Sequence, residues 1–170
     1  MIPFSIIGRE IESKNLVDYL LSYEKGLVVP LISVYGRSGS GKSTIVQFVC
    51  ENLELDYCYV NLRKAKTVFG CINLILSEMK HPNLKNAQGI NPAFTILENL
   101  IKESLSKSGN SLFVLCLDEF DTLFYDMRGK PSDFVYNLLV LVEKIRSMKN
   151  TYVLSPYLTK FCPSLVWMIE

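Results

Sequence analysis

The chain has 170 residues, enough for one domain, whether complete or incomplete. Its 18 basic and 17 acidic residues give a net charge of +1, so it lacks the concentrated positive charge of strong DNA-binding proteins, although a modest basic patch is not excluded. Hydrophobic residues make up 49% of the chain, yet the apolar runs are far shorter than the roughly 18 residues that span a bilayer. With no signal peptide evident, we expect a soluble intracellular protein without a membrane segment.

The chain contains an odd number of cysteines, and no two have the C-x-x-C spacing of metal or redox sites. Most lie in apolar stretches, where cysteine behaves as a small hydrophobic residue. We therefore expect them to be reduced and buried, with no disulfide and no structural metal. The cysteines are Cys50, Cys58, Cys71, Cys116 and Cys162. The one histidine, His81, stands in a polar, loop-like stretch and is expected at the surface.

The first predicted strand covers residues 28–35, a short apolar run that ends before Gly36. Such a run is typical of a strand buried on both faces. A helix is expected soon after it, with these apolar residues at helical spacing: Ile45, Val46, Phe48, Val49 and Leu53. Residues 57–62 predict a second strand.

Two helices are expected between the second and third strands. The first has an apolar stripe formed by Val68, Phe69, Ile72, Ile75, Leu76 and Met79. The second has a stripe formed by Phe94, Leu97, Leu100, Ile101 and Leu105. We expect Asn91 to cap this second helix and Pro92 to lie in its first turn.

A third strand is predicted at residues 111–117, a last helix at about 132–148 and a fourth strand at 151–155. Strands that alternate with helices in this way favour an α/β fold with a mostly parallel sheet.

A phosphate-binding loop is predicted at residues 36–43, GRSGSGKS, which fit the pattern G-x-x-x-x-G-K-[ST]. The motif follows a buried strand and opens a helix, as it must for backbone N–H groups to surround phosphate. Lys42 would reach the β- and γ-phosphates, and Ser43 would hold Mg²⁺ through its hydroxyl. The residues expected to contact nucleotide here are Gly36, Arg37, Ser38, Gly39, Ser40, Gly41, Lys42, Ser43 and Thr44. The alternative is a Gly/Ser turn before an unrelated helix.

Two carboxylates follow the third predicted strand. Asp118 would bind Mg²⁺ together with Ser43, and Glu119 would orient and polarise the attacking water as the catalytic residue. Adjacent carboxylates after an apolar run are costly to bury unless they coordinate something. A solvated strand end is the alternative, but together with the loop the pair predicts an ATP site.

Four stretches, in this order, resemble the AAA+ ATPases of the replication-initiator clade, the origin-recognition and cell-division-control proteins of archaea and eukaryotes. They are IIGRE at 6–10, GRSGSGKS at 36–43, YVNLRKAKT at 59–67 and DEFDTLF at 118–124. The resemblance implies a P-loop NTPase fold, a three-layer α/β sandwich. In the family the stretch around the R-E pair lies beside adenine, which would place Ile6, Ile7, Gly8 and Arg9 near the base.

The resemblance also implies a function: an ATP-binding, weakly hydrolysing core of a replication initiator, with ATP or ADP and Mg²⁺ as ligands. Its partners would be origin DNA and other initiator or helicase-loading proteins. Because the sequence has no nuclear-type basic cluster, we expect the cytoplasm of a prokaryotic (archaeal) cell. The family's initiator-specific element approaches DNA near Lys80, Lys85 and Asn86, which are the candidate DNA contacts.

Residues 1–155 would form the nucleotide-binding core and 156–170 a divergent tail, with the family's lid and winged-helix domains missing. Slow hydrolysis is expected because no residue matches the arginine finger and Pro156 falls at or next to the polar sensor position. The apolar residues 165–169 would either pair beside the first strand or be a remnant. Two other functions stay open: a signalling or defence-type P-loop ATPase with a protein partner, and an inactive truncated remnant.

Overall fold

The computed structural model describes residues 7–22, 31–65, 67–85, 89–110, 112–126, 130–146 and 150–155. Its α-helices are α1 (Glu10–Leu20), α2 (Lys42–Asn52), α3 (Val68–Glu78), α4 (Ile90–Ser108) and α5 (Pro131–Arg146). The strands are β1 (Leu31–Ser33), β2 (Asp56–Asn61), β3 (Leu112–Asp118) and β4 (Asn150–Ser155). Two 3₁₀ segments, η2 (Leu62–Lys64) and η4 (Phe120–Tyr125), follow β2 and β3.

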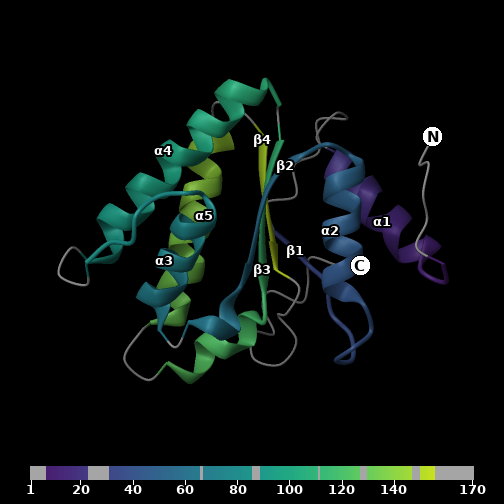
Figure 1. Cartoon of the computed structure of the whole chain (residues 1–170), viewed down its shortest axis with the longest axis horizontal. Helices are drawn as coiled ribbons and strands as arrows, with labels where there is room; N and C mark the ends of the chain where they lie inside the picture. Colours follow the sequence, from purple (N-terminus) through teal and green to yellow (C-terminus); the bar gives the residue numbers. More distant parts are fainter. Residues whose placement is uncertain are drawn as a thin grey trace.

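The described strands form one parallel sheet in the order β1-β4-β3-β2. Helices α1 and α2 cover one face of this sheet, and α3, α4 and α5 cover the other (Figure 1). The three-layer α/β fold expected from the sequence is thereby confirmed. Because all strands run in the same direction, the ends of β1, β2 and β3 lie at one edge of the sheet, where their connecting loops meet.

Strand β3 is the central element of the core, since all seven of its residues are buried. Successive side chains of a strand point to opposite faces. Leu112, Val114 and Cys116 pack with α1 and α2, whereas Phe113, Leu115 and Leu117 pack with α3, α4 and α5. Because side chains alternate, Asp118 lies on the same face as Cys116, the face covered by α2, and beside the loop that precedes α2.

Three aromatic rings fix the segment after β3. The Phe134 ring centroid lies 5.8 Å from that of Phe94 and 6.2 Å from that of Phe120, which joins α5 to both α4 and η4. Phe120 is 2% exposed and directly follows Glu119. The turn that carries Glu119 is therefore anchored in the larger half of the core.

The observed element bounds differ from the predicted ones by a few residues. Strand β1 ends at Ser33, two residues before the predicted end. Strand β2 ends at Asn61, because the Asn61 side chain accepts a hydrogen bond from Arg63 N (3.0 Å) and starts η2. Strand β3 includes Asp118, and α5 begins at Pro131, one residue earlier than expected.

The predicted helix cap at Asn91 is wrong. Helix α4 begins at Ile90, and Gly89 is its N-cap, with φ 76° and ψ 177°. This conformation is open to glycine but not to ordinary side chains, so the helix starts before Asn91. Pro92 does lie in the first turn, as predicted.

The expected burial is confirmed for four free cysteines, Cys50, Cys58, Cys71 and Cys116. Cys162 and the rest of the predicted tail lie outside the described residues. Burial raises the pKa of the Cys58 and Cys71 thiols to about 12.

Within the described ranges, no helix is both long and apolar enough to cross a bilayer. Those same ranges bring together no group of three or more histidine, cysteine, aspartate or glutamate residues that could hold a metal ion.

Candidate functional site

A glycine-rich loop joins β1 to α2. Gly39 and Gly41 have φ of 75° and 83°, which strain any residue with a side chain, and Gly41 is the N-cap of α2. A Cβ at Gly36 would lie 3.2 Å from Ser40 Oγ, so this position is also tight. The loop therefore depends on glycine for its shape. It ends at the N-terminus of α2, and the N–H groups of a helix N-terminus are a typical place for an anion to bind.

Lys42 is buried in this loop, with 6% of its surface exposed. Its Nζ donates hydrogen bonds to Gly36 O (2.8 Å), Arg37 O (2.7 Å) and Ser40 Oγ (3.3 Å). A buried ammonium is tolerated only when such partners replace water. The loop thus holds a positive charge in the place where an anion would bind.

A hydrogen bond joins the first turn of α2, directly after the loop, to the end of β3. Ser43 Oγ donates to Asp118 Oδ2 at 2.8 Å, and Glu119 N donates to Asp118 Oδ1 at 2.9 Å. Asp118 is only 4% exposed. A hydroxyl and a carboxylate are hard oxygen donors of the kind that Mg²⁺ takes together with the phosphates of a substrate. The predicted pair, Ser43 and Asp118, therefore fits a magnesium ion by its chemistry.

Tyr59 is a member of this cluster that sequence reasoning missed. Its hydroxyl also donates to Asp118 Oδ2. Burial and this bond raise the pKa of Tyr59 to about 12, although Ser43 and Gln47 lower it, so the hydroxyl stays protonated and donates. The sequence signal was only that Tyr59 lies within the strand predicted at residues 57–62, between the two motifs.

Glu119 lies in an unusual backbone conformation, with φ 56° and ψ 39°. The left-handed region costs a residue with a side chain about 1–2 kcal/mol. Its carbonyl accepts a hydrogen bond from Thr122 Oγ1 (2.7 Å), which together with buried Phe120 holds the turn. Strain of this kind concentrates at functional sites, and here it falls on the predicted catalytic residue.

The predicted adenine-binding stretch meets the loop through Arg9. Arg9 Nη2 donates to Ser40 O at 3.0 Å, and Nη1 pairs with Glu12 Oε1 at 2.8 Å. Ile7 is 95% exposed, and Ile6 lies outside the described residues. Of the other predicted contacts, Arg37, Ser38 and Thr44 are exposed around the loop.

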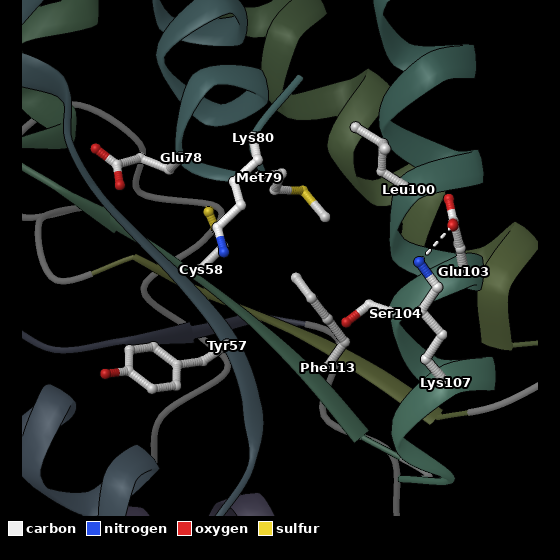
Figure 2. A pocket seen from close by; sticks show the side chains of 10 residues that line it. All are labelled: Tyr57, Cys58, Glu78, Met79, Lys80, Leu100, Glu103, Ser104, Lys107 and Phe113. Atoms are coloured by element: carbon white, nitrogen blue, oxygen red, sulfur yellow. Dashed lines mark ion pairs between the residues drawn. The ribbon is translucent and has the colours of Figure 1, made fainter.

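The candidate DNA contacts lie elsewhere, after α3. Lys80 and Lys85 are exposed, and Asn86 is outside the described residues. Lys80 lines a pocket of about 470 Å³ formed by β2, β3, α3 and α4, together with the Glu103–Lys107 ion pair (Figure 2). Helices α3 and α4 cover the sheet face opposite α2 (Figure 1), so the structure does not bring Lys80 to Lys42.

Comparison with known proteins gives related families for most of the chain. A family model described as "ATPase family associated with various cellular activities (AAA)" matches residues 32–155. The ORC1-type DNA replication protein of Desulfurococcus amylolyticus is 27% identical over 157 residues, covering 87% of this chain and 38% of that protein. The ORC1-type DNA replication protein 1 of Sulfurisphaera tokodaii is 28% identical over 145 residues, covering 81% and 34%.

Solved structures share the fold. The Aeropyrum pernix ORC2 protein, in its ADPNP–ADP complexes, has a TM-score of 0.67 and 24% identity, covering 92% of this chain and 43% of that one. The Aeropyrum pernix ORC1 protein in complex with DNA has a TM-score of 0.58 and 21% identity, covering 91% and 40%. This chain therefore spans 34% to 43% of the length of these four relatives.

Proposed function

The chain belongs to the AAA family of ATPases and, within it, to the clade of replication initiators, and from this premise we propose that it binds ATP with Mg²⁺. Residues 1–155 would form the nucleotide-binding core and 156–170 a tail. The observation that carries the proposal is the partly buried hydrogen bond from Ser43 Oγ, just after the loop, to Asp118 Oδ2 at the end of β3. It joins a loop holding a buried lysine to a carboxylate, the two halves that a Mg-nucleotide site requires.

Each residue has a separate task in this proposal. Lys42 exchanges loop carbonyls for the β- and γ-phosphates of ATP or ADP, and the N–H groups at the start of α2 bind the same phosphates. Ser43 and Asp118 hold Mg²⁺, which neutralises phosphate charge when bound. The adenine side of the site is formed by Ile7, Gly8 and Arg9, and Arg9 is hydrogen-bonded to Ser40 O of the loop.

Glu119 is the proposed catalytic base. It orients a water and accepts its proton, a role worth about 10²–10⁴ in rate. We expect slow turnover by this chain, because an arginine finger adds about 10³–10⁵ in related NTPases and no arginine of this sequence matches one.

We further propose that the protein acts in replication initiation, with DNA as a partner. The support is the replication names of the relatives, together with one fold neighbour, an ORC1 protein whose structure was solved in complex with DNA. These names favour replication over the signalling or defence alternative. Lys80 and Lys85 remain the candidate DNA contacts, and the archaeal relatives support an archaeal cytoplasm as the location.

Thermal melting tests the nucleotide site. Mg-ATP at about 100 times its Kd adds about 2.7 kcal/mol to the free energy of unfolding by mass action, so the Tm should rise. Lys42→Ala should abolish the rise, because it removes the buried cation of the loop. Lys107→Ala, which changes a 74% exposed lysine on α4, should keep it. No rise in the wild-type chain at saturating Mg-ATP would leave the inactive-remnant alternative standing.

A further inference from the structure

The Asp118 carboxylate is held by three hydrogen bonds from three different segments. Glu119 N, in the turn after β3, donates to Oδ1. Ser43 Oγ, in the first turn of α2, and the Tyr59 hydroxyl, in β2, both donate to Oδ2. A carboxylate that is 4% exposed requires such donors in place of water.

The place of Tyr59 follows from the sheet register. Tyr59 pairs with Cys116 of β3, and Asn61 pairs with Asp118. Alternate residues of a strand share a face. Tyr59 therefore lies on the α2 face, one pleat before Asp118, with its ring packed against the α2 core and its hydroxyl at the carboxylate.

We propose that Tyr59 is a positioning residue that fixes the Asp118 carboxylate for Mg²⁺; this inference rests on the proposed nucleotide site. An aspartate side chain turns easily about its last torsion, so its orientation depends on its hydrogen bonds. Of the three donors, Glu119 N belongs to the adjacent residue and Ser43 is itself a proposed metal ligand. Tyr59 alone among them comes from an element with no other proposed part in metal binding.

Removing the hydroxyl should therefore weaken the effect of Mg²⁺ on nucleotide affinity. Residues that orient metal ligands typically contribute about 10–100-fold to metal affinity. For Tyr59→Phe we expect the ratio of ATP affinity with Mg²⁺ to that with EDTA to fall about tenfold. Affinity in EDTA should stay at the wild-type value, because the phosphate loop and Lys42 are untouched.

The chain offers a matched control in Tyr57. This residue lies two positions earlier in β2, on the same face, and its hydroxyl donates to Glu51 Oε1 at 3.1 Å. Figure 2 shows its ring pointing away from the pocket residues of α3 and α4. Tyr57→Phe removes a hydroxyl from the same strand and should leave the affinity ratio unchanged.

The experiment is a titration of a fluorescent ATP analogue into wild type, Tyr59→Phe and Tyr57→Phe, each in Mg²⁺ and in EDTA. Binding in EDTA at wild-type affinity also shows that a variant is folded. A second comparison uses Asp118→Asn, in which adding Tyr59→Phe should lower the ratio no further.

Two results would overturn the inference. The first is an unchanged ratio in Tyr59→Phe, including an equal loss of affinity with and without Mg²⁺, and the second is a full additional loss in the Asp118→Asn background. If the wild-type chain does not bind the analogue at all, the proposed function fails and this inference fails with it. Wild-type binding with an unchanged Tyr59→Phe ratio defeats the inference alone.

Discussion

Lys42 and Asp118 are both charged and almost fully buried, at 6% and 4% exposure. Burial of either charge without partners would cost several kcal/mol. Lys42 is compensated by the carbonyls of its own loop, whereas Asp118 is compensated by donors from α2, β2 and the following turn. Each charge therefore has a fixed position before any ligand arrives, which is the condition for a preorganised phosphate and metal site.

Glu119→Gln should separate binding from turnover. The amide keeps the size of the side chain but cannot accept the proton of an attacking water, so hydrolysis should fall by about 10²-fold or more while ATP affinity stays the same. Release of inorganic phosphate measures the first quantity and an ATP titration the second. Asp121→Asn, at an exposed position in the same motif, is the control. Hydrolysis at the wild-type rate in Glu119→Gln would mean that another group positions the attacking water.

At the scale of elements, the C-cap of α4 is a glycine whose left-handed backbone conformation disfavours other residues. Gly109 has φ 75° and ψ 0°, and its N–H donates to Leu105 O at 3.2 Å. A Cβ would meet nothing within 4 Å, so the cost of Gly109→Ala is backbone strain alone. We expect a loss of about 1 kcal/mol in the free energy of unfolding. Urea unfolding measures it, and Gly109→Asn should lose less, since asparagine tolerates this region better. An unchanged midpoint for Gly109→Ala would contradict this account of the cap.

A second element-scale contact joins α4 to α5. Glu98 accepts a hydrogen bond from Lys102 Nζ at 2.5 Å, and its other oxygen lies 3.6 Å from Lys144 Nζ on α5. The Lys102 hydrogen bond, followed by the charges of Lys102 and Lys144, lowers the pKa of Glu98 below its ordinary value. The folded state thus binds fewer protons than the unfolded state. The stabilisation is full above the unfolded pKa and is lost as the pH falls through the folded pKa.

Glu98→Gln should therefore lower the free energy of unfolding at pH 7 by about 0.5–1 kcal/mol, with the difference from wild type shrinking in acid. Urea unfolding across pH 3–7, about the range in which carboxylates titrate, measures both effects. Glu103→Gln removes an equally spaced pair with Lys107 in which the carboxylate is 57% exposed, and it should have no measurable effect. A loss for Glu98→Gln that does not change with pH would rule out the ion pair as its cause.

At the scale of the whole molecule, the parallel sheet was predictable because both of its faces are covered. A run such as 112–117 is then continuously apolar and recognisable in the sequence. The proximity of Ser43 and Asp118 could also be predicted, because the ends of parallel strands meet at one edge of the sheet. Tyr59 was missed because its role depends on the β2–β3 register, which periodicity does not reveal. The prediction of Asn91 as the helix cap was wrong because Gly89 is the N-cap of α4, and its backbone conformation could not be deduced from the apolar pattern.

The most direct test of the nucleotide site is calorimetric titration of Mg-ATP into the 170-residue chain and into Lys42→Ala. We predict saturable binding of one nucleotide per wild-type chain and no detectable binding to the variant, because Lys42 supplies the buried positive charge of the loop. Wild-type affinity in Lys42→Ala, or no binding in the wild-type chain, would contradict the assignment of residues 36–44 and Asp118 as a nucleotide site.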